Sequence, residues 1–180
     1  LLEFYLGTLG ADLSYVKADG EVGLTAALEL THREERVNIM LGDLGSLPDF
    51  GPNALVERDF KLFKEADYVA IFNWAATRRS GTQLAETVFR YVKKEGKART
   101  YFDSGDPTPN KENILSLLKN VLKARLLDVL SVNENEAFQY ASLLDKRVRR
   151  VRRKLDHHEL AKECARILSK NLAVRVDLHT

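Results

Sequence analysis

The chain has 180 residues, of which 44% are hydrophobic and 30% charged, proportions typical of a globular protein and unlike those of a disordered or collagen-like chain. Its 28 basic and 26 acidic residues leave a formal net charge of +2, so its overall field favours neither a nucleic acid nor a membrane as partner. No apolar stretch approaches the ~20 residues of a membrane-spanning helix, and the single cysteine, Cys164, cannot form an internal disulfide. We therefore expect a cytoplasmic protein that binds no nucleic acid and no membrane.

The first 53 residues are expected to hold the end of a helix, a β-hairpin and a loop. Apolar and polar residues alternate over 22–41 on either side of a polar turn at His32–Glu35, which predicts the hairpin. Residues 42–53 are rich in Gly, Pro, Asp and Asn, a composition typical of an ordered loop with several turns. Because the chain begins at Leu1 and ends in a strand-like segment, we expect it to be truncated at both ends.

Residues 54–180 predict an α/β core, because short apolar strands alternate with helical patterns. The strands are predicted at 68–72, 99–102, 127–132 and 172–178. Apolar residues at helical spacing predict helices around 84–92, 114–122, 137–144 and 160–168. Strands separated by helices of this length predict crossover connections and a parallel sheet covered on both faces. The predicted fold class is therefore α/β.

Polar residues follow three of these strands at equal spacings of 30 residues. They are Asn73, Asp103 and Asn133, and Asp106 and Glu136 lie close behind the last two. The carboxyl ends of parallel strands meet at one edge of a sheet, where carboxylates suit Mg²⁺ and helix N-termini suit phosphate. The same residues also fit a structural role, since Asn133 with Glu136 is a helix-capping pattern and Asp103 opens a turn-like segment.

Three segments together resemble the central part of a ribokinase-like (PfkB) carbohydrate kinase. They are Val129-Leu-Ser-Val-Asn-Glu-Asn-Glu-Ala137, the preceding Asp103-Ser-Gly-Asp-Pro107, and the hairpin that starts at Gly23. The resemblance spans nearly the whole chain, and its sharpest motif is the N-x-x-E of Asn133 and Glu136. It implies a ribokinase-like parallel sheet flanked by helices, with the hairpin as a small β lid.

The resemblance also implies an activity, namely transfer of a phosphoryl group from a nucleotide to a carbohydrate hydroxyl with Mg²⁺. Glu136 and Asp103 are implied as metal ligands, and these two with Asn133 as the nucleotide site. ATP is the implied donor, and the choice between ATP and ADP is left open. The general base of the family is an Asp in a Gly-Ala-Gly-Asp motif. The 180 residues contain no such segment, so we name no catalytic residue.

Substrate contacts are implied for Thr25 and Ala27 on the lid and for Asn73 at a strand end. Pairing of lids between two copies of such kinases implies a homodimer through the hairpin. Two alternatives remain: a nucleoside kinase of the same fold and a non-catalytic sugar- or nucleotide-binding module.

Two further features have more than one interpretation. The basic run Lys146–Lys154 could bind an acidic partner, but Val148, Val151 and Leu155 recur within it at helical spacing, which favours one face of an amphipathic helix. Trp74, the only tryptophan, follows Asn73 and could either stack on a ligand or pack beneath the sheet edge.

Overall fold

The structure, a computed structural model, describes residues 2–17, 20–32, 35–152 and 154–179. The chain divides into two compact units, an N-terminal unit (Leu1–Leu47) and a C-terminal unit (Pro48–Thr180). The division falls within the loop expected at 42–53, which contains two short 3-10 turns, Leu47–Asp49 and Pro52–Ala54. Among the described residues, no helix is both long and apolar enough to cross a membrane.

The N-terminal unit contains the predicted hairpin. Helix α1 (Leu2–Thr8) comes before two antiparallel strands, β1 (Leu24–His32) and β2 (Glu35–Asp43). The expected turn includes Arg33 and Glu34, which lie outside the described residues. The apolar residues that alternate along the two strands face one another in register, as in the pair Leu28 and Ile39, and these two side chains are 46% and 40% exposed. The hairpin therefore presents an exposed apolar face.

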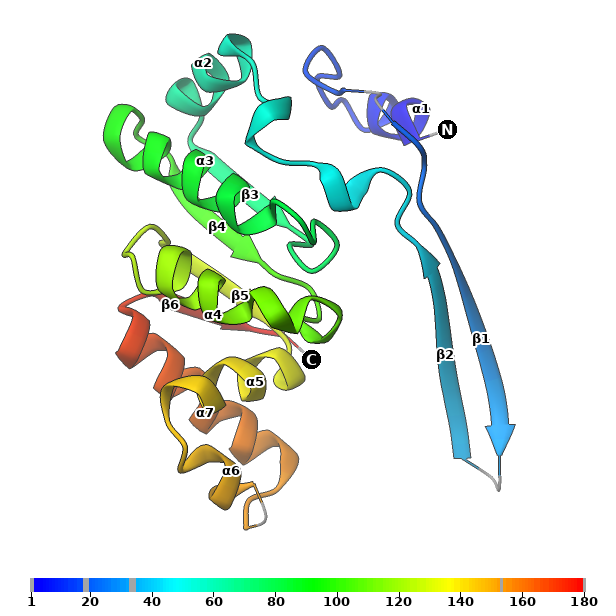
Figure 1. Ribbon diagram of the computed structural model, residues 1–180, viewed down its shortest axis with the longest axis vertical. Helices are drawn as coiled ribbons and strands as arrows, with labels where there is room; N and C mark the ends of the chain where they lie inside the picture. The colour runs from blue at the N-terminus through cyan, green and yellow to red at the C-terminus, as the bar shows by residue number, and fades with distance from the viewer. Residues whose placement is uncertain (1, 18–19, 33–34, 153, 180) are drawn as a thin grey trace. The chain divides into compact units, whose positions relative to one another are not determined.

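The C-terminal unit is an α/β core around a four-stranded parallel sheet with the strand order β3-β4-β5-β6 (Figure 1). The α/β fold class predicted from the sequence is thereby confirmed. Its strands are β3 (Tyr68–Phe72), β4 (Arg99–Asp103), β5 (Val129–Val132) and β6 (Arg175–Leu178). Its helices are α2 (Glu57–Glu65), α3 (Gly81–Glu95), α4 (Ile114–Leu117), α5 (Glu134–Leu144), α6 (Val148–Val151) and α7 (His157–Leu172).

Helices α3, α4, α5 and α7 pack on one face of the sheet. Val69, Phe102 and Leu130 point from successive strands into a single apolar core shared with α3, α4, α5 and α7. On the opposite face, Tyr68 and Phe72 are 66% and 63% exposed. The prediction that helices cover both faces is therefore wrong for the described part of this unit. The reason is the consecutive strand order, since crossovers of the same hand place every connecting helix on the same side.

Several element boundaries differ from those predicted. The third strand begins at Val129 instead of 127, and residues 172–174 are not part of a strand, because α7 continues to Leu172 and Ala173 ends it with a φ of 53°. Helix α4 is only four residues long and continues as a π-helical turn, Leu118–Leu122. Helix α2 was not predicted. Of the described residues of the basic run, the four of α6 are helical, and Val148 is buried.

Candidate functional site

The carboxyl end of β4 forms a tight turn around Asp103. One carboxylate oxygen of Asp103, Oδ1, accepts a hydrogen bond from the backbone N–H of Gly105 at 3.1 Å. The other, Oδ2, accepts one from the Ser131 hydroxyl on β5 at 2.9 Å. Gly105 has a φ of 61°, a conformation that glycine adopts at little cost. Asp103 is therefore held in a fixed position between two neighbouring strands.

Asn73 lies beside this turn. Its backbone N–H donates to the Asp103 carbonyl oxygen at 2.9 Å, and its φ of 58° is one that Asn tolerates better than most residues. A Cβ atom on Gly105 would come within 3.3 Å of the Asn73 Oδ1 atom, so the two residues are in close contact. The structure thus brings Asn73 to the same edge as Asp103, with its side chain exposed.

Asn133 and Glu136 form a reciprocal cap at the start of α5. The Asn133 side-chain oxygen accepts from the Glu136 backbone N–H at 2.9 Å, and the Glu136 carboxylate accepts from the Asn133 backbone N–H at 3.1 Å and from its side-chain amide at 2.8 Å. Glu136 is only 3% exposed. The capping role considered for these residues is therefore present, and it holds a carboxylate buried at the sheet edge.

Asp106 is the third carboxylate here, and we call Asp103, Asp106, Asn133 and Glu136 the rim cluster. The Asp106 Oδ1 atom accepts from the backbone N–H and hydroxyl of Thr108 at 3.0 and 2.7 Å, and from the Gln139 amide at 3.3 Å. Burial favours a higher pKa for Asp106, but these hydrogen bonds outweigh it and lower the pKa. Asp106 is therefore held as a carboxylate.

The pKa of Glu136 responds to burial and to its neighbours in the rim cluster. Burial is the largest influence and raises the pKa of this carboxyl. The hydrogen bond from the Asn133 backbone and the nearby His179 act to lower the pKa. The neighbouring carboxylates of Asp103 and Asp106 raise it further. A bound cation would relieve this repulsion, since opposite charge favours the ionised form.

Ser131 and His179 extend the cluster and were not predicted as site residues. Ser131 is 3% exposed, and its hydroxyl lies 3.3 Å from the His179 Nδ1 atom while donating to Asp103. This arrangement differs from a hydrolase triad, because the serine lies between acid and imidazole and its proton is committed to the carboxylate. Ser131 therefore has a positioning role.

The rim cluster offers carboxylate oxygens at the sheet edge but, in the described part of the chain, no complete cage for a metal ion. Among the described residues, no group of three or more His, Cys, Asp or Glu side chains is arranged to enclose a metal ion. Mg²⁺, however, is usually bound by one or two carboxylates and completes its shell with water and phosphate oxygens. Glu136 and Asp103 provide hard oxygen donors, and the charge of Asp103 contributes to the raised pKa of Glu136. Carboxylate oxygens are the kind of ligand that Mg²⁺ prefers.

The predicted site residues divide between the two units. Asn73, Asp103, Asn133 and Glu136 lie together in the C-terminal unit, whereas Thr25 and Ala27 lie on β1 of the N-terminal unit, where both are exposed. Trp74 is fully buried and its indole N–H donates to the Thr82 hydroxyl at 3.0 Å, so it packs beneath the edge and offers no stacking surface.

Comparison of the chain with models of protein families, with curated proteins and with solved structures finds no match. The functional assignment consequently rests on the residues and geometry of the rim cluster.

Proposed function

We propose that the chain is the central part of a ribokinase-like sugar kinase, which transfers a phosphoryl group from a nucleotide to a carbohydrate hydroxyl. The observation that carries the proposal is the convergence of Asp103, Asn133 and Glu136 at the carboxyl ends of β4 and β5. In parallel α/β sheets, ligands bind at this edge. The three residues are also those that the resemblance assigns to the nucleotide and metal.

In the proposed site, Glu136 and Asp103 would hold Mg²⁺, directly or through water. The metal, when bound, neutralises charge on the nucleotide phosphates. Asn133 keeps the Glu136 carboxylate in place through its amide and backbone N–H. Asn73 at the end of β3 is the proposed sugar contact in this unit, and Thr25 and Ala27 are the proposed contacts from the lid. No residue of this chain is proposed as the general base.

A non-catalytic binding module is a second candidate, and the hydrogen bonding of the carboxylates favours it. Asp103, Asp106 and Glu136 each accept two or more hydrogen bonds from protein groups. These hydrogen bonds hold the carboxylates in fixed positions, an arrangement that suits ligand binding and assigns none of them a proton-transfer role. Such a module would bind Mg²⁺ with a nucleotide but would transfer no phosphoryl group.

The first experiment is calorimetric titration of the 180-residue chain with ATP, in the presence of Mg²⁺ and in the presence of a chelator. We expect binding to require Mg²⁺ and to weaken by about tenfold or more in Glu136→Gln. Glu134→Gln is the matched control, since Glu134 lies in the same first turn of α5 outside the cap. We expect Glu134→Gln to bind as the wild type does.

Equal binding with and without Mg²⁺, or equal losses in the two variants, would contradict the proposal. Because Glu136 also caps α5, Asp103→Asn provides a second variant whose loss of binding cannot come from that cap. Titration of free sugars and of nucleosides in the presence of Mg²⁺ and ADP then distinguishes a sugar acceptor from a nucleoside acceptor. A phosphoryl-transfer assay with ATP, Mg²⁺ and the acceptor that binds separates the kinase from the binding module.

A further inference from the structure

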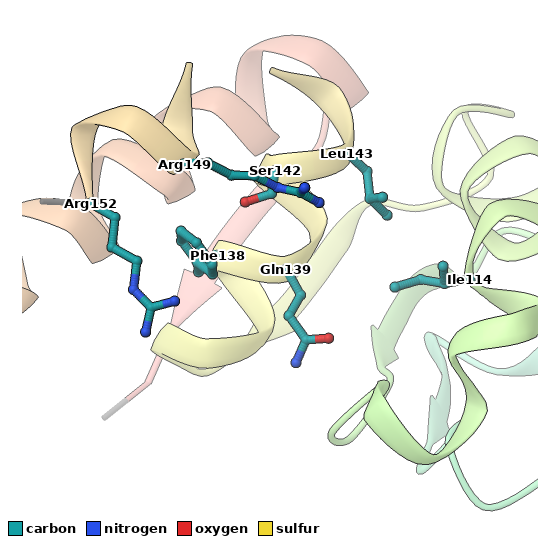
Figure 2. A pocket seen from close by; sticks show the side chains of 7 residues that line it. All are labelled: Ile114, Phe138, Gln139, Ser142, Leu143, Arg149 and Arg152. Carbon is teal, nitrogen blue, oxygen red and sulfur yellow. The ribbon is translucent and has the colours of Figure 1, made fainter. Parts of the chain in front are cut away.

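A pocket lies between α4, α5 and the α6 segment (Figure 2), and its lining includes Gln139, which donates to Asp106 of the rim cluster. Its volume is about 690 Å³, within the range of sites that bind small organic molecules. Ile114 on one side and Phe138 and Leu143 on α5 form its apolar wall. Its polar wall contains two arginines, Arg149 and Arg152, which come from the basic run that the proposed function does not use.

The structure gives these two arginines no counter-ion among the residues that it describes. Neither Arg149 nor Arg152 forms an ion pair with any carboxylate of the described residues, whereas Arg147 of the same run pairs with Asp145 at 2.7 Å. The Arg152 guanidinium lies 4.7 Å from the centre of the Phe138 ring, a cation–π contact that holds it at the pocket wall. Two guanidinium groups that share a pocket without a carboxylate favour a bound anion.

Ser142 provides an independent indication of a ligand. Ser142 is 6% exposed, and its hydroxyl oxygen is buried without a hydrogen-bond partner among the described residues. Like Phe138 and Arg149, Ser142 lines the pocket (Figure 2). A buried hydroxyl without a partner is unfavourable, and such groups in native proteins call for an explanation. A ligand oxygen in the pocket would satisfy it.

We propose that this pocket binds an organic phosphate monoester. The phosphate would lie between the guanidinium groups of Arg149 and Arg152 and accept a hydrogen bond from Ser142. The apolar part of the ligand would pack on Phe138. A phosphate monoester fits better than a carboxylate. It has three terminal oxygens, one for each of the two guanidinium groups and the hydroxyl, whereas a carboxylate has only two. This inference does not depend on the proposed kinase function.

The test is calorimetric titration of the 180-residue chain with phenyl phosphate, inorganic phosphate and phenol. We expect phenyl phosphate to bind more tightly than inorganic phosphate, since only phenyl phosphate covers the apolar wall, and we expect phenol not to bind. Arg149→Gln and Arg152→Gln should each weaken phenyl phosphate binding by about tenfold or more. Arg150→Gln is the matched control, because Arg150 belongs to the same run but does not line the pocket. It should leave binding nearly unchanged.

A second variant separates binding from folding. Ser142→Ala removes an unpartnered buried hydroxyl, so we expect it to be at least as stable to urea as the wild type and yet to bind phenyl phosphate more weakly. Equal losses in all three arginine variants, or no binding of phenyl phosphate, would overturn the proposal. So would tighter binding of a single-stranded oligonucleotide that all three arginine variants weaken alike, since this would identify the run as a nucleic-acid surface.

Discussion

The cap formed by Asn133 supports a buried carboxylate, and Asn133→Ala tests that support. The substitution removes the side-chain oxygen that accepts from the Glu136 N–H, a loss of about 1 kcal/mol for an ordinary cap. It also removes the amide that donates to the Glu136 carboxylate, a hydrogen bond to a charged group worth about 1.5–3 kcal/mol. We therefore expect the free energy of unfolding to fall by about 3 kcal/mol.

The assay is urea unfolding followed by tryptophan fluorescence. Trp74, the only tryptophan, is fully buried in the C-terminal unit, so its emission reports on the unit that contains the substitution. Asp156→Ala is the matched control, because Asp156 caps α7 by accepting from the Glu159 N–H and supports no buried carboxylate. The urea midpoint should fall further in Asn133→Ala than in Asp156→Ala.

The loss in Asn133→Ala should also depend on pH. The pKa of Glu136 is raised in the folded protein, mainly by burial, so its ionisation opposes folding. That cost is absent below the unfolded-state pKa and is fully present once the pH has risen above the folded-state pKa. The Asn133 amide stabilises the ionised form of Glu136. The loss of unfolding free energy in Asn133→Ala should therefore be largest at neutral pH. It should shrink as the pH falls through the range between the folded-state and unfolded-state pKa values of Glu136. A loss no greater than that of Asp156→Ala, or one independent of pH, would refute the reasoning.

Three further predictions concern other parts of the chain. Thr82→Val leaves the buried Trp74 N–H without its partner and should lower the free energy of unfolding by about 1–3 kcal/mol in the same urea assay, whereas Thr87→Val in the same helix should have little effect. Burial raises the pKa of Cys164 to about 11, so a thiol reagent should modify it at mildly alkaline pH only after urea unfolding; modification of the folded chain would contradict this. If copies pair through the exposed apolar face of the hairpin, Ile39→Lys should sediment as a monomer at concentrations at which the wild type dimerises, and a wild type that remains monomeric would count against pairing.

Local patterns predicted the elements whose signal lies within one short segment. The strand at 68–72 matches β3 to the residue, and the helical spacing around Leu84 and Val88 matches the buried side of α3. The nine-residue helix α2 was missed because it is short and only Asp59 of its residues is buried. The strand predicted to begin at 172 was too long. Leu172 is the apolar last residue of α7, and Ala173 ends that helix in a left-handed conformation just before β6, so the apolar end of the helix was read as the start of the strand.

The candidate site was predictable in part. Asp103, Asn133 and Glu136 were predicted to lie together because they stand at or just after strand ends, which can be located from the sequence, and the structure places all three at the ends of β4 and β5. Ser131 and His179 were not predicted as site residues, since they join the cluster through contacts across 28 and 48 residues of sequence. A contact of that kind depends on which strands become neighbours.

By itself, the sequence determined the α/β class, the hairpin, the parallel strands and the polar residues at the strand ends, because periodicity and capping act over a few neighbouring residues. Only the tertiary structure decided the strand order, the placement of the helices on one face, the burial of Trp74 and of Glu136, and the pocket that Arg149 shares with Phe138. These features depend on packing between segments distant in the chain, and many alternative pairings would satisfy the same local patterns.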